Sequence, residues 1–468
     1  MDGLECSEIN RSELERTLRI DSEFYSKSAI KVSDMLQSRS HDLLTTFVNV
    51  SDGNHMGISD YFIDEGVPYY RGQDAGAFFI ENSNPICIDE KTFELPVMKR
   101  SHLKKGDVIL SIVGTIGSLS LVYSDKSATC SCKLAILRPK EGKNAELLAT
   151  FLRGKYGQAQ ITRFTRGAVQ KGLILEDMDQ LVVPVFGDGI VEAIRNAIQS
   201  AYQIQEKANN CYREAQRTLV NSVGSISVPA ESVSVRNIST SFYTTGRLDA
   251  EYYQPKYDAL FTVLSTIKTK KLGGAHGIVN IEKSIDPGSE VYVEDGIPFV
   301  RVSDVSKFEI SEPEVKLRND ILPNPEVLFP QKDTILLSKD GSVGIAYKTE
   351  STMPVITSGA LLHLTVRNKA EVLPDYLTLV LNSPIVQLQA ERDSNGAIIQ
   401  HWKPSEIENV IIPVLDMDIQ KEIATKVQES FALRKQSKQL LEYAKQAVEM
   451  AIEQGEDVAM EWLKDKVN

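Results

Sequence analysis

The sequence is poor in the features that mark membrane-bound or exported proteins. Its longest apolar stretches, such as residues 108–113, are far shorter than the roughly 18 residues needed to cross a bilayer. Residues 1–5 contain neither the basic nor the apolar segment of an export signal. Cysteine is scarce, at five in 468 residues, and this odd number predicts no disulfide framework. We therefore expect a cytoplasmic chain with reduced thiols and no membrane contact.

Motifs of DNA-modifying enzymes and metal sites are also missing. There is neither the Asn/Asp-Pro-Pro-aromatic tetrapeptide of an adenine methyltransferase nor the Walker A sequence of an ATP-driven motor. Asp304 with residues 314–316 imitates the spacing of a nuclease, but Pro313 precedes it and the first half of the chain has no counterpart. Cys130 and Cys132 are too close for a metal half-site, and the six histidines are scattered. These absences favour a non-catalytic chain without cofactor or metal, and leave a catalytic DNA enzyme as the weaker alternative.

Positive charge is in deficit, because the net charge is −12. A protein that binds DNA tightly on its own usually carries a basic footprint. The acidic residues are, however, concentrated between residues 282 and 326 and in the segment after Glu449. Local basic faces are therefore compatible with the composition, and we expect a partner to supply much of any phosphate contact. The segment 449–468 is expected to form a further helix that packs on a partner.

The chain contains an internal repeat. Four pairs of similar segments stand in the same order, 227 to 230 residues apart. They are residues 19–25 with 247–253, 65–71 with 295–301, 114–117 with 341–344, and 181–185 with 410–414. A single short match arises by chance, but four at a nearly constant offset indicate a duplication.

Both copies follow one expected plan. A short helical lead-in precedes β-branched runs broken by Gly, Pro, Asn and Asp, a pattern typical of strands and turns. Each copy then has a buried strand entering a Gly-x-x-Gly turn, a helix, a polar loop and a last strand. The predicted strands are residues 107–111 and 333–337, the helices are 145–153 and 374–382, and the last strands end at Pro184 and Pro413. We predict an α+β chain with two duplicated mixed α/β domains of roughly 165 residues each.

A long helix without Pro or Gly is predicted after each copy, at residues 190–219 and 419–448. Alternating steps of four and three residues place one seam along each helix, as in a coiled coil. The seam positions are Ile190, Ile194, Ala197, Ala201, Ile204, Ala208, Cys211 and Ala215 in the first helix and Ile419, Ile423, Lys426, Ser430, Leu433, Ser437, Leu440 and Ala444 in the second. Small and polar seam residues favour close antiparallel pairing of the two helices, each about 45 Å long.

With these features together, the sequence resembles the DNA-specificity subunits of type I restriction–modification systems. The resemblance rests on the Arg-[Ile/Leu]-Asp-x-Glu-aromatic-Tyr, Gly-[Val/Ile]-Pro-aromatic-x-Arg and Gly-x-x-Gly elements, and on residues 167–170 and 396–400 before the last strands. It extends from about Ile20 to Val448. One departure is Lys332, which we align with Gly106.

The resemblance implies a non-catalytic reader of double-stranded DNA. Each target-recognition domain would read one half of a two-part target in the major groove, and the coiled coil would set the gap between the halves. Two methyltransferase subunits that flip and methylate adenine with S-adenosylmethionine are the implied partners, and a restriction subunit using ATP and Mg²⁺ is a further one. A coiled-coil scaffold that binds only proteins remains the alternative from another class.

The domain boundaries follow from the repeat and the seams. We expect a lead-in at 1–19, recognition domain 1 at 20–187, spacer helix 1 at 188–222, a linker at 223–246, recognition domain 2 at 247–416, spacer helix 2 at 417–454 and an acidic tail at 455–468.

Candidate DNA-binding residues lie in basic stretches of the two domains. Residues 147–175 hold several cations, and the candidates in and beside the loop are Arg163, Arg166, Gln170 and Lys171. The equivalent loop in copy two offers Gln400, His401 and Lys403, and a second cluster in copy one offers Lys99, Arg100, Lys104 and Lys105. Arg and Gln can make paired contacts with guanine and adenine edges. The alternative for both stretches is a solvated surface, and for the second cluster a solvated turn.

Two recurring features have structural interpretations. Arg71 and Arg301 stand at equivalent positions, which we interpret as a structural ion pair ahead of base reading. The Gly114–Gly117 and Gly341–Gly344 segments lack the Lys-Ser/Thr of a phosphate loop, so we predict tight turns.

Overall fold

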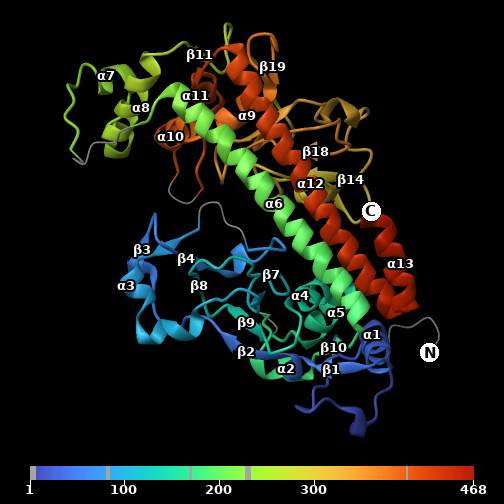
Figure 1. Cartoon of the computed structure of the whole chain (residues 1–468). Helices are drawn as coiled ribbons and strands as arrows, with labels where there is room; N and C mark the ends of the chain where they lie inside the picture. Colours follow the sequence, from blue (N-terminus) through green and yellow to red (C-terminus); the bar gives the residue numbers. More distant parts are fainter. Residues whose placement is uncertain (1–6, 81–84, 168–170, 227–232, 397–398, 468) are drawn as a thin grey trace. The chain divides into compact units, whose positions relative to one another are not determined.

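The computed structural model describes residues 7–80, 85–167, 171–226, 233–396 and 399–467 (Figure 1). It separates into two compact units, of which unit 1 consists of Met1–Gln205 with Lys435–Asn468 and unit 2 consists of Glu206–Arg434. Each unit therefore combines one copy of the repeat with a part of both long helices.

Three small sheets form the β-structure of unit 1. One pairs β1 (His41–Leu43) with β10 (Val182–Pro184). The second has the order β2 (Val48–Asp52), β9 (Leu134–Pro139), β6 (Val108–Ser111), β7 (Leu119–Leu121). The third has the order β3 (Phe62–Ile63), β5 (Cys87–Ile88), β4 (Val67–Tyr70), β8 (Thr129–Cys130).

Unit 2 repeats these sheets strand for strand. They are β11 (Thr269–Lys271) with β20 (Ile411–Pro413); β12 (Val279–Lys283), β19 (Leu361–Val366), β16 (Ile335–Ser338), β17 (Ala346–Lys348); and β13 (Tyr292–Val293), β15 (Lys316–Leu317), β14 (Ile297–Val300), β18 (Ile356–Thr357). In both units the last pair, β4–β8 or β14–β18, is parallel and the other pairs are antiparallel. The common strand order confirms the duplication and the predicted mixed α/β domains.

Several helices also recur. The helices of the chain are α1 (Lys27–Gln37), α2 (Leu44–Phe47), α3 (Glu90–Phe93), α4 (Ala145–Arg153), α5 (Lys155–Phe164) and α6 (Asp188–Val223), then α7 (Phe242–Thr245), α8 (Pro255–Ser265), α9 (Pro374–Leu381), α10 (Pro384–Asp393), α11 (Pro404–Glu408), α12 (Met417–Gln454) and α13 (Glu456–Val467). Of these, α1, α4, α5 and α6 correspond to α8, α9, α10 and α12. The helices predicted at 145–153 and 374–382 are confirmed as α4 and α9. The expected helical lead-ins are a turn before α1 in unit 1 and a 3₁₀ helix, Ala250–Tyr253, before α8 in unit 2.

The structure corrects the alignment of the two copies by one residue around the buried strands. Ser111 and Ser338 both end their strands and both accept a backbone hydrogen bond from the last glycine of the following turn. The counterpart of Gly106 is therefore Asp333, not Lys332, and both have positive φ, +90° and +65°. Asp tolerates this left-handed conformation better than most residues with a side chain.

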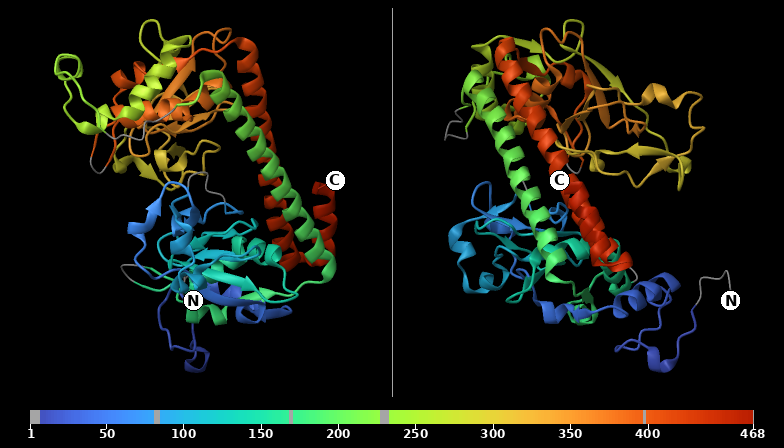
Figure 2. Two further views of the ribbon diagram at one scale, coloured as in Figure 1. Left: turned by 60° about the vertical axis from the view of Figure 1, so that its left-hand side comes forward. Right: turned by 45° about the vertical axis from the view of Figure 1, so that its right-hand side comes forward.

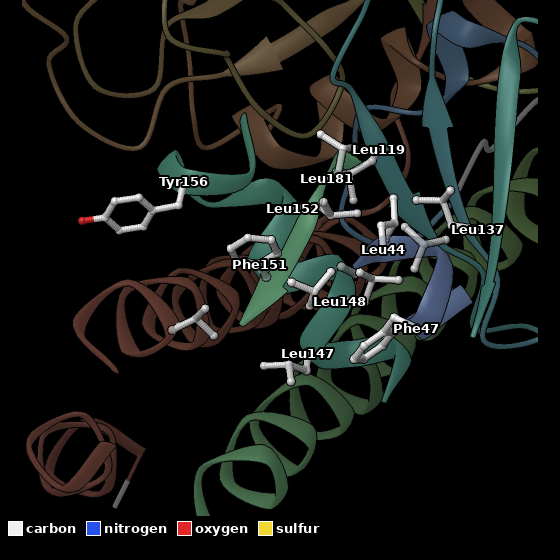
Figure 3. Packing of buried hydrophobic residues seen from close by; sticks show 14 of the residues in the cluster. Leu44, Phe47, Leu119, Leu137, Leu147, Leu148, Phe151, Leu152, Tyr156 and Leu181 are labelled. Carbon is white, nitrogen blue, oxygen red and sulfur yellow. The ribbon is translucent and has the colours of Figure 1, made fainter. Parts of the chain in front are cut away.

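Helices α4 and α9 anchor the core of their units. In unit 1, Leu148, Phe151 and Leu152 of α4 are almost fully buried and lie near Leu119 and Leu181 (Figure 3). In the middle of α5 and α10, glutamines hold the last strands: Gln160 exchanges two hydrogen bonds with the backbone of Val182. Gln389 makes the same pair with Ile411. The strands β10 and β20 are thus held in place by equivalent side chains.

The long helices α6 and α12 lie side by side (Figures 1 and 2). In unit 2, Thr218 bonds to Glu422, Glu214 pairs with Lys426, and the Ser430 hydroxyl donates to the carbonyl of Ala208 at 2.7 Å. Rising numbers on α6 meet falling numbers on α12, so the pairing is antiparallel. In unit 1, the Ser437 hydroxyl donates to Ala201 at 2.8 Å.

Most positions of the predicted seam are buried, Ile204, Ile419, Leu433 and Leu440 are partly buried, and the placement of Lys426 in the seam is wrong. Ile194, Ala201 and Ala208 are fully buried on α6, as Ser430 and Ala444 are on α12. Lys426, in contrast, is partly exposed and forms its ion pair at the edge of the seam. Val427, which is 3% exposed, is buried in its place, because burial of an apolar side chain does not carry the cost of removing a charge from water.

The C-terminal segment is helical as expected, but α13 packs within its own unit. Ala459 and Leu463 are buried, and Trp462 meets Tyr443 of α12 edge to face at 5.7 Å. Glu456 accepts a hydrogen bond from the backbone of Gly187, just before α6. The apolar side of this acidic helix is thereby covered by the chain itself.

Candidate nucleic-acid interface

A Gly-x-x-Gly turn follows the central buried strand in both units. Gly114 and Gly117 have φ of +82° and +87°, and Gly341 and Gly344 have +72° and +85°. Side chains rarely adopt these values, so glycine suits the turn. Tight turns were predicted here, and they are confirmed.

A second segment, the tip of the polar loop, lies against each turn. Arg166 and Gly172 exchange two backbone hydrogen bonds of 2.8 Å, and Asn395 and His401 do the same at 3.0 and 2.7 Å. Gly172 forms a bridge with Val113, and His401 forms one with Asp340. We call the Gly-x-x-Gly turn, together with the described loop residues beside it, the reading edge of each unit. These loop residues are Arg166, Lys171 and Gly172 in unit 1 and Asn395, Gln400 and His401 in unit 2.

Equivalent glutamines brace the reading edges from behind. Gln158 donates to the carbonyls of Gly117 and Leu152 at 3.0 and 2.7 Å. Gln387 donates to those of Gly344 and Leu381 at 2.7 and 2.9 Å. Each turn is thus bonded through a glutamine to the end of a core helix, α4 in unit 1 and α9 in unit 2. The two edges are therefore supported in an equivalent way.

The structure places two of the predicted arginines inside the fold. Arg163 donates from Nε to the carbonyl of Phe24 at 3.0 Å, and its guanidinium lies 4.3 Å from the centre of the Phe24 ring. Burial lowers its pKa. It lines a cleft of about 820 Å³ together with Glu15, Lys27 and Gln180, and not the reading edge.

Arg166 pairs with Asp177, whose side chain is 1% exposed, at 2.6 Å. Burial raises the pKa of Asp177, and the charge and hydrogen bond of Arg166 partly oppose this. Lys171, in contrast, is 60% exposed and only loosely paired with Glu23, at 3.7 Å. Gln170 lies outside the described residues. Lys171 is therefore the candidate of this loop that is open to a ligand.

The candidates of unit 2 lie on or next to its reading edge. Gln400 is exposed, and its carbonyl accepts a hydrogen bond from Gly341. His401 bonds through Nδ1 to Asp340 at 2.8 Å. Burial raises the pKa of Asp340, but hydrogen bonds from Lys339 and His401 outweigh it, so the pKa is lowered. Lys403 is exposed at the start of α11, 3.6 Å from Glu406.

The second basic cluster lies on a 3₁₀ helix, Pro96–Ser101, and the turn after it. Lys99 and Lys104 are exposed. Arg100 is paired with Asp52, and Lys105 lies 3.3 Å from Asp125. DNA contact by these residues remains a prediction, as it does for the loop candidates.

Sequence reasoning missed how Arg71 and Arg301 are placed. Each follows a strand of the third sheet, β4 or β14, and lies near the Gly-x-x-Gly turn of its unit. The Thr115 hydroxyl donates to the carbonyl of Gly72 at 3.0 Å. In unit 2 a shallow hollow of about 400 Å³ is lined by Arg301, Asp340 and Gly341. The strand order alone could not reveal this, because turn and arginine are brought together by tertiary packing.

The described residues carry few other features of a site. Among them, no group of three or more His, Cys, Asp and Glu side chains is arranged for a metal ion. Over the same part of the chain, no helix combines the length and apolar character of a membrane span. The reading edges themselves present amide, hydroxyl and carboxylate groups, which are able to form hydrogen bonds with the edges and backbone of a nucleic acid.

Comparison with known proteins identifies the second copy. Residues 264–443 match the family model described as type I restriction modification DNA specificity domain. The chain is similar to the S subunit of the type I restriction–modification system from M. genitalium, at 15% identity over 91% of this chain and 95% of that one, with a TM-score of 0.36. It is also similar to the HsdS subunit from Thermoanaerobacter tengcongensis, at 14% identity over 91% and 95%, with a TM-score of 0.28.

A further similar structure comes from work on complex assembly and conformational transition of the type I R-M system, at 14% identity over 91% and 96%, with a TM-score of 0.28. Curated proteins gave no match. The matched range covers the sheets of unit 2, and unit 1 repeats their strand order. Residues 264–443 are therefore similar to the type I restriction modification DNA specificity domain, and unit 1 is a structural repeat of the unit that contains most of them.

Proposed function

We propose that this chain is the specificity subunit of a type I restriction–modification system and reads a two-part DNA sequence. One observation carries the proposal: each unit contains an equivalent reading edge, supported by an equivalent glutamine, Gln158 or Gln387. The loop residues at the two edges differ, Lys171 against Gln400, on a common scaffold. That combination suits a protein that reads two different half-sites with one architecture.

The recognition domains proposed for this task are residues 20–187 and 247–416, with spacer helices at 188–222 and 417–454. The candidate contacts are Lys171, Gln400, His401 and Lys403 at the edges, with Lys99, Arg100, Lys104 and Lys105 as phosphate contacts. A substitution of a phosphate-binding lysine should weaken binding to all sequences equally and lower the salt dependence. Lys104→Gln tests this prediction. Lys435→Gln is the matched control, because Lys435 is also exposed but lies on α12.

The partners follow from the proposed role of the chain as a specificity subunit. We propose that two methyltransferase subunits bind the chain in the cytoplasm and methylate adenine with S-adenosylmethionine, and that a restriction subunit using ATP and Mg²⁺ can join them. The net charge of −12 supports a DNA interface that the chain shares with its partners, because a negatively charged chain on its own would repel the phosphates of DNA.

The deciding experiment is sequencing of methylated adenines in host DNA with and without this chain, after co-purification with the neighbouring methyltransferase subunit. The proposal expects a stable complex and a two-part methylated motif that disappears when the chain is removed. Unchanged methylation would contradict it. A complex that forms without any sequence preference would instead favour the protein-binding scaffold.

A further inference from the structure

An arginine at an equivalent position in each unit has a buried Nε atom without a hydrogen-bond partner among the described residues. Arg71 follows β4 and starts a 3₁₀ turn, Gly72–Asp74, and Arg301 follows β14 and starts the turn Val302–Asp304. The carboxylates of Asp74 and Asp304 accept hydrogen bonds from the backbone N–H of these same arginines, at 2.8 and 2.7 Å. The aspartates therefore cap the turns through the main chain.

The guanidinium groups are held only loosely by these carboxylates. Nε lies 3.6 Å from Asp74 and 3.9 Å from Asp304, which is beyond hydrogen-bond distance. Both Nε atoms are buried and have no hydrogen-bond partner among the described residues. A buried donor without a partner costs about 1–3 kcal/mol and is rare, and here it recurs at equivalent positions.

Arg138 shows how a purely structural arginine of this chain is bound. It makes hydrogen bonds of 2.7 and 2.6 Å to Asp107 and a third of 3.1 Å to the carbonyl of His102. Arg71 and Arg301 lack such a set, although their side chains are 35% and 41% exposed, similar to the 35% of Arg138. The structural ion pair that we expected from the sequence is thus weak in both units.

Both arginines border the reading edges. The residue after Arg71 accepts a hydrogen bond from Thr115 in the Gly-x-x-Gly turn. Arg301 lines the hollow that also contains Asp340 and Gly341, and Asp340 is bonded to His401 of the loop tip. A ligand on a reading edge would therefore lie close to one of these arginines.

We propose, on the basis of the proposed function, that Arg71 and Arg301 are DNA-contacting residues, one for each half-site. The planar guanidinium suits two adjacent acceptors, which DNA offers as O6 and N7 of guanine or as the oxygens of one phosphate. In both cases the ligand is a pair of adjacent acceptor atoms on the DNA. Asp74 and Asp304 lie near Nε of the two arginines, so the terminal N–H groups of each guanidinium remain as donors for this pair.

The test uses the full chain in complex with its methyltransferase subunits. Arg71→Gln and Arg301→Gln are compared with wild type and with Arg195→Gln, an arginine of α6 that is similarly exposed, at 40%, and lies outside the reading edges. The probes are a duplex with the methylated motif found in host DNA and two duplexes with one half-site scrambled. We expect a loss of affinity of about 10- to 100-fold for Arg71→Gln and for Arg301→Gln on the intact motif, and none for Arg195→Gln.

The scrambled probes separate the two sources of the acceptor. If the contact is to guanine, the loss for Arg71→Gln vanishes when one half-site is scrambled, and the loss for Arg301→Gln vanishes with the other. If the contact is to phosphate, the loss persists on all probes and the slope of log affinity against log salt falls by about 1. Arg71→Lys and Arg301→Lys should retain the phosphate contact and lose the guanine one.

Two results would overturn the inference while leaving the proposed function intact. One is wild-type affinity in both Gln variants. The other is loss of complex formation in the Lys as well as the Gln variants, which would make the arginines structural. A wild-type complex without a two-part motif would instead refute the proposed function itself.

Discussion

Single charged contacts inside the two units decide which basic side chains remain open to a ligand. Arg166 and Lys171 stand five residues apart in one basic loop, yet Arg166 is bonded to buried Asp177 and Lys171 points outward. Removing one partner of a buried pair leaves the other charge without compensation. The two residues should therefore respond differently to the same substitution.

Arg166→Gln should lower the free energy of unfolding of the chain by about 3 kcal/mol, because Asp177 would stay buried without a cation. Lys171→Gln should change it by less than about 0.5 kcal/mol, because the side chain is exposed. Urea denaturation of both variants measures the difference. The double variant Arg166→Gln with Asp177→Asn should recover part of the loss, and equal stability of the single variants would contradict the buried pair.

The pH dependence of stability should contain a contribution from His363. Burial lowers its pKa to about 4 from an ordinary value of 6.5, and it is hydrogen-bonded to Thr357 at 2.8 Å. A lowered pKa means that the folded state favours the neutral ring. The stability that the neutral ring contributes is therefore complete above pH 6.5 and is lost as the pH falls towards 4. The loss amounts to about 2 kcal/mol at pH 5.

His363→Gln should thus show a smaller loss of unfolding free energy between pH 7 and pH 5 than the wild type does. His276→Gln is the matched control, because His276 is exposed. Urea denaturation at the two pH values gives the comparison. An identical pH dependence in wild type and His363→Gln would show that the ring is not held neutral.

At the scale of the element, the helix pair depends on small residues at its seam. Ser430 and Ser437 are buried, and each donates to a carbonyl of the opposite helix. The contact brings the serine side chain directly against the facing backbone. A larger side chain at either position has no room without separating the helices.

Ser430→Leu and Ser437→Leu should each lower the free energy of unfolding by about 1–3 kcal/mol through overpacking. The corresponding Ala variants should cost about 1 kcal/mol or less, because only one hydrogen bond is lost. Thermal denaturation of the four variants tests this, with Ala432→Leu, an exposed site on the same helix, as control. Leu variants as stable as the control would refute close packing at the seam.

The elements also show what could be predicted from sequence. Residues 145–153 and 190–219 form helices as predicted, because apolar periodicity is a local property of the chain. The reading edge was not predicted as a unit, since it joins Val113 to Gly172 through a bridge that no local pattern records. Arg163 was counted with the exposed cations because its partner, the carbonyl of Phe24, lies 139 residues away in sequence.

At the scale of the whole molecule, α6 and α12 are the elements that contribute to both units. Gln205 and Arg434 mark the points on these helices where one unit ends and the other begins. The ruler role expected from the sequence can be tested at these points, since they lie near each other in the antiparallel pairing of Ala201 with Ser437 and Ala208 with Ser430.

Insertion of seven residues after Gln205 and after Arg434 should lengthen the preferred gap between the half-sites by up to about three base pairs, because a heptad adds about 10 Å of helix. Sequencing of methylated adenines in cells carrying the altered chain gives the new motif. A second chain with the insertion in only one helix breaks the pairing and should lose methylation. An unchanged gap with the double insertion would rule out the helices as a ruler.

The composition of the two units has a consequence for the order of events during synthesis. Unit 2 is one continuous stretch, residues 206–434, and all of it leaves the ribosome before the residues that complete unit 1. Until then, the core of unit 1 lacks Ala444, Val448 and Ile452 of α12 and Leu463 of α13. Apolar side chains of the first half that share this core, such as Ile194 and Ile198, lack these partners while the second half is made, and exposed apolar surface of this kind is prone to aggregation. The N-terminal half of this protein is thus the last to mature.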